Sequence, residues 1–108
     1  MGENRKLLGK VAMVFGGSRG IGAAIVRRLA EDGADVALTY VSAANKAAET
    51  VEAVETTGRK ALAVKADSAD AAAIQEAVTQ AVDRFGRLDI IVVNVGILRL
   101  GSVETVSL

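Results

Sequence analysis

Apolar residues along this chain follow two alternating patterns. Short continuous apolar runs are typical of strands covered on both faces, whereas an apolar residue at every third or fourth position is typical of a helix. The chain carries four runs of the first kind, separated by three segments of the second kind. The predicted strands are Val11–Phe15, Val36–Tyr40, Ala61–Ala66 and Leu88–Val95.

Each predicted helix has a residue that suits its beginning or its end. Ile21, Ile25 and Leu29 recur at helical spacing and form the apolar stripe of the first helix. Serine and aspartate favour the N-cap of a helix, and glycine favours the position just after its last turn. We expect a first helix over Ile21–Ala30 that stops at Gly33, a second capped by Ser42 and ended by Gly58, and a third capped by Ser68 or Asp70 and ended by Gly86.

Strands that alternate with helices pair in parallel through right-handed crossovers. The expected fold class is therefore α/β. We predict a Rossmann-like half with a four-stranded parallel sheet in the order 3-2-1-4, three helices and three α/β/α layers, in one domain over residues 1–108. The first two helices should cover one face of the sheet and the third helix the other.

Composition narrows the class of protein. Apolar residues make up 51% of the chain and aromatic residues 3%, so we expect a core of Ala, Val, Ile and Leu. The 13 basic and 13 acidic side chains cancel, which argues against nucleic acid or an anionic membrane as a partner. The chain has neither cysteine nor histidine, so we expect no disulfide framework and no metal site. No segment resembles a signal peptide or a membrane span, which favours the cytoplasm.

The segment Gly16–Gly22 lies between the first predicted strand and the first predicted helix. Glycines let the backbone turn tightly and approach a ligand, and a helix N-terminus offers N–H groups and a partial positive charge. This combination suits the pyrophosphate of a dinucleotide, although a surface loop rich in glycine is the simpler alternative. A P-loop is excluded because no Lys-Ser or Lys-Thr pair follows Gly22.

The spacing Gly16-x3-Gly20-x-Gly22, with Ser18 and Arg19 inside it, resembles the classical short-chain dehydrogenase/reductase family. Within that family it is most similar to 3-oxoacyl-[acyl-carrier-protein] reductases. The resemblance extends over Leu8 to Gly101 and corresponds to roughly the first two-fifths of a family member. It also rests on Leu8-Gly9-Lys10-Val11-Ala12, on Asp67, and on Phe85-Gly86-Arg87-Leu88-Asp89-Ile90.

The resemblance implies NADP(H) as cofactor. Arg19 stands where NADP-using members often carry a basic residue, although a solvated loop arginine is the alternative. The second strand ends in Thr39-Tyr40-Val41-Ser42 and lacks the acidic residue that would bind the ribose of NAD. Asp67 would contact the adenine or cap the third helix. The implied cofactor-binding residues are Gly16, Ser18, Arg19, Gly20, Ile21, Gly22, Asp67, Asn94 and Gly96.

Three positions depart from the family pattern. Phe15 stands before the first motif glycine, where the family has a threonine. On the fourth strand, Val93 stands where the family has an asparagine, and Val95 stands where it has an alanine. Because side chains alternate along a strand, these residues and Met13 should line one face of the two neighbouring strands. A bulky Phe15 ring under the glycine loop would distort or fill the site, which favours a structural role. We interpret the cluster as a repacked face of an engineered or selected fragment, with ordinary divergence as the alternative.

The family transfers a hydride to a carbonyl with a serine and a Tyr-x-x-x-Lys pair. The chain's one tyrosine, Tyr40, has Ala44 four residues later, so no such pair is present. We therefore predict an NADP(H)-binding half of a short-chain reductase that is inactive alone and has no catalytic residues of its own. The fourth strand should lie at the edge of the sheet and favour self-association as a homodimer. The alternative is a self-assembling structural fragment whose cofactor binding is vestigial.

Overall fold

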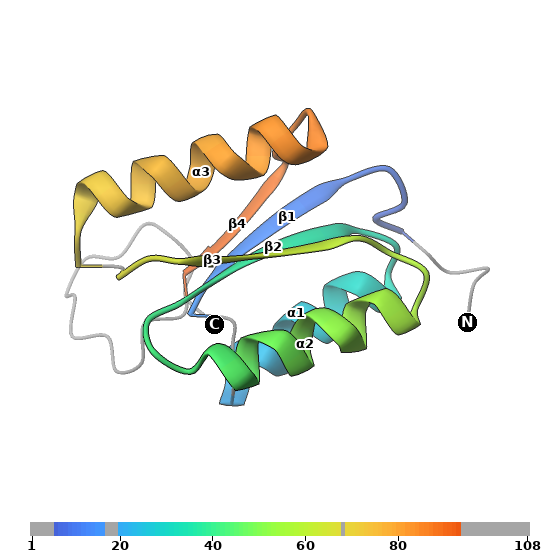
Figure 1. The fold of residues 1–108 in the computed structure, drawn as a ribbon. Helices are drawn as coiled ribbons and strands as arrows, with labels where there is room; N and C mark the ends of the chain where they lie inside the picture. The colour runs from blue at the N-terminus through green and yellow to red at the C-terminus, as the bar shows by residue number, and fades with distance from the viewer. Residues whose placement is uncertain (1–5, 17–19, 68, 94–108) are drawn as a thin grey trace, which may run out of the picture.

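A four-stranded parallel sheet separates two helical layers in the part of the chain that this computed structural model describes, residues 6–16, 20–67 and 69–93 (Figure 1). The elements in chain order are β1 (Val11–Phe15), α1 (Gly20–Glu31), β2 (Asp35–Tyr40), α2 (Ala44–Thr56), β3 (Ala61–Lys65), α3 (Ala71–Phe85) and β4 (Ile90–Val93).

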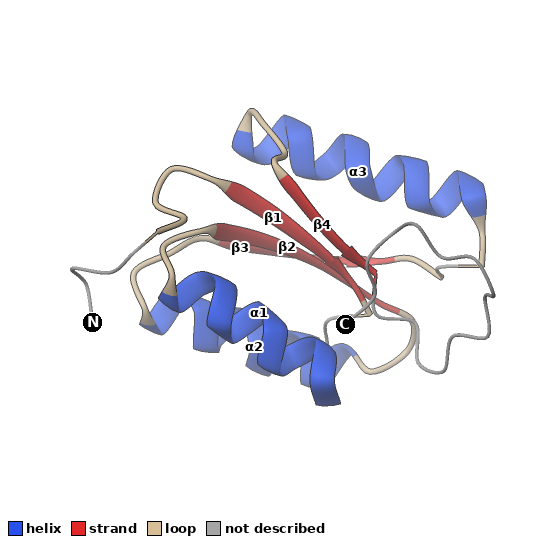
Figure 2. Cartoon of the chain, turned by 180° about the vertical axis from the view of Figure 1, so that it is seen from behind, coloured by secondary structure: helices blue, strands red, loops and turns tan. Residues whose placement is uncertain are grey.

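The strand order is β3-β2-β1-β4, with every neighbouring pair parallel, as the sequence predicted. The helices α1 and α2 cover one face of the sheet, and α3 crosses the other (Figure 1). In the sheet, β2 and β3 lie on one side of β1, and β4 lies on its other side. The carboxyl ends of all four strands point to the same edge, which lies on the right in Figure 2.

Two cores fill the space between the layers. One, the α1/α2-side core, takes Ala12 and Val14 from β1 together with buried residues of α1 and α2. The other, the α3-side core, takes Met13 and Phe15 from β1 together with Ala77 and Ala81 of α3. Alternate side chains of β1 therefore enter opposite cores, which explains why the whole strand is apolar.

The predicted grouping of Phe15 with Val93 is confirmed. The two residues are partners in the register of β1 and β4, and both belong to the α3-side core. Phe15 is 6% exposed, so its ring packs into this core below the glycine loop. Val95, the third residue of the predicted group, lies outside the described residues.

The apolar stripe predicted for α1 differs from the face that the helix buries. The buried residues of α1 are small or branched: Gly22, Ala23, Val26 and Ala30. Ile25 and Leu29 are half-buried at the margin of this face, and Ile21 is 66% exposed. Small side chains occupy the centre of the buried face because they let α1 approach the sheet closely.

One predicted helix cap is confirmed and one is wrong. Asp70 is the N-cap of α3, where its carboxylate accepts the N–H groups of Ala72 and Ala73 at 3.0 and 3.2 Å. The N-cap of α2 is Ala43, which makes no side-chain capping bond, so Ser42 lies one residue too early to cap the helix. The other candidate for α3, Ser68, lies outside the described residues.

The fourth strand is shorter than predicted at its start. Its pairing with β1 begins at Ala12 beside Ile90, and Leu88 and Asp89 precede it. The Asp89 N–H donates to the Val11 oxygen at 2.8 Å, and the Val11 N–H donates to the Asp89 carboxylate at 2.9 Å. At this point the Asp89 carboxylate, instead of a backbone oxygen, accepts the N–H at the start of β1. The end predicted for this strand lies outside the described residues.

Candidate functional site

The candidate site lies at the carboxyl edge of the sheet, where β1 gives way to α1. Gly16 follows β1 with φ of 80°, and Gly20 opens α1 with φ of 64°. These left-handed backbone conformations favour glycine over any residue with a side chain. Space is not the constraint at Gly20, since a Cβ there would meet nothing within 4 Å. Gly16 and Gly20 therefore shape the turn through their backbone freedom.

The beginning of α1 suits an anionic ligand. The first N–H groups of a helix have no acceptor inside it, and the helix dipole places a partial positive charge there. The first turn of α1 carries no acidic residue, and Arg28 lies in the last turn. Gly22 is buried in the first turn, whereas the Ile21 side chain is exposed beside the loop. Both residues lie where the sequence placed the cofactor site.

The loop is tied to the neighbouring strand by a side chain. The Gly16 N–H donates to the Thr39 hydroxyl oxygen at 2.9 Å. Thr39 lies in β2 and is 1% exposed, whereas Gly16 is half-buried, so the bond joins a buried side chain to the start of the loop. Sequence reasoning treated Thr39 only as part of a strand end without an acidic residue. The available signal was a hydroxyl in an otherwise apolar strand next to the glycine loop.

The third strand brings Asp67 to the same edge. The Ala66 N–H donates to the Tyr40 oxygen at 2.8 Å, which holds this segment beside the end of β2. The Asp67 carboxylate accepts the N–H of Ala69 at 2.9 Å, and its backbone oxygen accepts the N–H of Asp70. Asp67 therefore shapes the turn before α3, and the idea that it caps the helix is wrong because Asp70 does so. Its side chain stays exposed at the carboxyl edge.

The glycines at positions 16, 20 and 22, Ile21 and Asp67 lie at the carboxyl edge of the sheet, with Asp67 two strands away from β1. The other predicted site residues, Ser18, Arg19, Asn94 and Gly96, lie outside the described residues. Tyr40 is half-buried and packs against the α1/α2-side core. Within the described ranges, no group of three acidic side chains could hold a metal ion.

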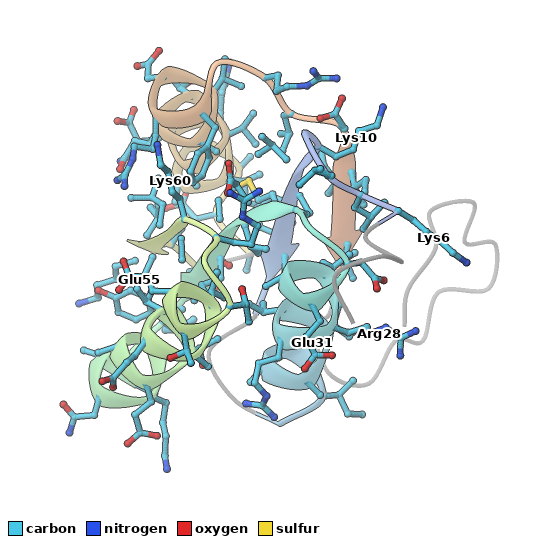
Figure 3. All side chains as sticks on the ribbon, turned by 90° about the vertical axis from the view of Figure 1, so that its right-hand side faces the viewer. Lys6, Lys10, Arg28, Glu31, Glu55 and Lys60 are labelled. Atoms are coloured by element: carbon cyan, nitrogen blue, oxygen red, sulfur yellow. The ribbon has the colours of Figure 1, made fainter. Side chains whose placement is uncertain are left out.

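The clear pKa shifts within the described residues occur at the opposite edge. The Arg87 guanidinium lowers the pKa of the Asp89 carboxyl through paired hydrogen bonds of 2.9 and 2.8 Å, and the Val11 N–H adds to this effect. Figure 3 views this amino edge, where Lys10 and Lys60 lie at the starts of strands and Glu31 and Glu55 lie near the ends of helices. Charges of both signs mix there, away from the glycine loop.

Comparison with known proteins gives consistent matches. The family model described as short chain dehydrogenase matches residues 10–108. An uncharacterized oxidoreductase of Methylorubrum extorquens is 47% identical over 102 residues, which are 94% of this chain and 41% of that protein. The solved short-chain dehydrogenase/reductase of Serratia marcescens is 60% identical with a TM-score of 0.83, over 95% of this chain and 42% of that one.

A short chain dehydrogenase of Burkholderia cenocepacia, solved in complex with NADP, is 53% identical with a TM-score of 0.83. The match covers 95% of this chain and 42% of that protein. The chain thus spans about two-fifths of the length of the relatives that it matches. No helix in the described part of the chain is long and apolar enough to cross a membrane.

Proposed function

Because this chain belongs to the short-chain dehydrogenase family, we propose that it is the NADP(H)-binding part of an oxidoreductase that acts on carbonyl compounds. The observation that carries the proposal is the turn from β1 into α1. Gly16 leaves the sheet with a positive φ, and α1 begins at the same edge without an acidic residue in its first turn. A pyrophosphate placed there would accept N–H groups and meet the positive end of the helix dipole.

The choice of NADP over NAD rests on the end of β2 and on Arg19. NAD-binding folds place an acidic side chain near the ribose 2′-hydroxyl, whereas β2 ends in Thr39 and Tyr40, followed by an exposed Val41. Arg19, a residue of the glycine-rich motif, supplies a guanidinium for the 2′-phosphate. The NADP complex of the Burkholderia cenocepacia relative supports this choice.

The chemistry is divided between the cofactor and the chain. Bound NADPH would supply the hydride. The residues proposed here would hold the cofactor: the motif glycines would bind the pyrophosphate, Asp67 would face the adenine, and Asn94 and Gly96 would border the cofactor. No Tyr-x-x-x-Lys pair occurs in the sequence, so we propose that this chain by itself binds the cofactor without reducing a ketone. The 3-oxoacyl-[acyl-carrier-protein] reductase subtype remains our prediction for the whole protein.

A titration tests the proposed function. We expect NADPH to raise the melting temperature of the chain and to change its own fluorescence on binding, with a weaker effect from NADH. Arg19→Ala should weaken NADPH binding roughly tenfold and leave NADH binding unchanged, because only NADP carries the 2′-phosphate. Arg28→Ala is the matched control, since it removes an exposed arginine from the other end of α1.

If millimolar NADPH changes neither the fluorescence nor the melting temperature, the binding proposal fails. The alternative, a self-assembling fragment that keeps the fold without the cofactor, would then be favoured. Reduction of a ketone by the purified chain would contradict the proposed lack of activity.

We also propose that copies of the chain associate through β4. Among the described strands, β4 pairs with β1 and has no strand on its other side. Ile91 lies on the α3 side of this outer strand, beside Met13 in the register, and is 50% exposed. An outer strand with an exposed apolar side chain is a template for pairing with a second copy.

A further inference from the structure

Thr39 holds an unusual position for a polar residue. Within the described residues, Thr39 and Thr50 are the buried polar side chains. Both neighbours of Thr39 on its side of the sheet are apolar: Ala37 precedes it along β2, and Val64 is its partner on β3. A buried hydroxyl is costly unless it is hydrogen-bonded, so its partner indicates why it is tolerated.

That partner is the backbone of the glycine loop. The register between β1 and β2 pairs Val14 with Leu38, and two residues further along the Gly16 N–H donates to the Thr39 hydroxyl at 2.9 Å. Gly16 has φ of 80°, so this bond is made where the chain leaves the sheet. A side chain fixed inside β2 thus defines the position of the first residue of the loop.

We propose that Thr39 is a positioning residue that holds Gly16, where β1 leads into the cofactor site, in the backbone position that suits cofactor binding. The proposal rests on the proposed function for its effect on affinity, but the hold on Gly16 can be tested without a ligand. Thr39 is buried and its hydroxyl accepts the Gly16 N–H, so its effect would act through Gly16. Preorganising a loop improves affinity because less ordering remains to be done on binding.

Thr50 offers a matched control. It is 3% exposed, like Thr39, and its hydroxyl donates to the Lys46 oxygen at 3.0 Å within α2. Removing either hydroxyl therefore removes a buried hydrogen bond. The Thr50 bond to Lys46 lies within α2, whereas the Thr39 bond reaches Gly16 at the start of the glycine loop.

The experiment compares Thr39→Val, Thr39→Ser and Thr50→Val with the wild-type chain. Valine keeps nearly the shape of threonine without the hydroxyl, and serine keeps the hydroxyl. We expect Thr39→Val to weaken NADPH binding about three- to tenfold and to speed amide hydrogen exchange at Gly16, measured by NMR. Thr39→Ser should restore both properties, and Thr50→Val should change neither.

The inference is overturned if Thr39→Val exchanges at Gly16 as slowly as wild type, or if Thr50→Val weakens binding as much as Thr39→Val. A wild-type chain that binds no NADPH would refute the proposed function instead. The exchange rate at Gly16 would then decide the inference alone: faster exchange in Thr39→Val, rescued by serine, supports it.

Discussion

At both ends of β1, a side chain accepts a backbone N–H group of this segment. At its start the Val11 N–H donates to the Asp89 carboxylate, and just beyond its end the Gly16 N–H donates to the Thr39 hydroxyl. The two acceptors come from segments on opposite sides of the strand, the approach to β4 and the interior of β2. The strand that leads into the candidate site is therefore secured at each end by one specific residue.

Asp89 makes stability depend on pH. Its pKa is lowered in the folded chain, mainly by the hydrogen bonds from Arg87, so its contribution is present above the unfolded value and is lost as pH falls through the folded one. We expect the wild-type melting temperature to fall between neutral pH and about pH 3, and Asp89→Asn to reduce that fall.

The control for this prediction is Asp32→Asn. It removes an ion pair with the exposed Arg28 at 3.4 Å, an interaction that contributes little in water. Thermal unfolding followed by circular dichroism at the two pH values measures the difference. Equal pH dependence in wild type and Asp89→Asn would show that the carboxylate does not act in this way.

The helices differ in how their ends are stabilised. The N-cap of α3 is Asp70, and its C-cap is Gly86 with φ of 84°, whose N–H donates to the Val82 oxygen at 2.7 Å. The N-cap of α2 is Ala43, which offers no side-chain acceptor. Because α3 is the one described helix on its face of the sheet, we expect its ends to bear more directly on the stability of the fold than those of α2.

Replacing the cap of α3 should therefore destabilise the whole chain. We expect Asp70→Ala to lower the free energy of unfolding by about 1 kcal/mol, since two N–H groups of the first turn lose their acceptor. Asp70→Asn keeps a capping oxygen and should stay close to wild type. Urea unfolding measures both, and an Asp70→Ala chain as stable as wild type would refute the role of the cap.

The same elements show what a sequence pattern can predict. The strands, the helices and their order followed from apolar periodicity and from glycine at the helix ends, because these signals are local. The prediction that Ser42 caps α2 was wrong because the position of the N-cap depends on where the helix starts. Tertiary packing sets that start one residue later. The bond between Thr39 and Gly16 joins residues 23 positions apart, so the hydroxyl in the apolar run was visible in the sequence but its partner was not.

The arrangement of layers leaves β4 less covered than the other strands. α3 packs over β1, β2 and β3, and β4 is the outer strand beside β1. Ile91 of β4 and Val82 of α3 both lie on the α3 side of the sheet, and both side chains are exposed. The sequence predicted an outer fourth strand, since the order of strands follows from the sequence of crossovers. That Ile91 is exposed could be seen only in the structure.

We therefore expect the chain to sediment as a dimer at high micromolar concentration. Ile91→Lys should shift the chain to a monomer, because a charge would have to be buried at the contact. Leu8→Lys is the matched control, since Leu8 is also exposed but precedes β1. A wild-type chain that sediments strictly as a monomer, or a dimer unaffected by Ile91→Lys, would contradict the proposed contact.

The single tyrosine has a practical consequence. Tyr40 ends β2 next to Thr39, its backbone oxygen accepts the N–H of Ala66, and the chain contains no tryptophan. All ultraviolet emission from tyrosine therefore originates at the carboxyl edge, between the glycine loop and the turn at Asp67. Binding of NADPH at this edge would change that emission. The unmodified chain thus carries its own optical reporter for the edge where we place the cofactor.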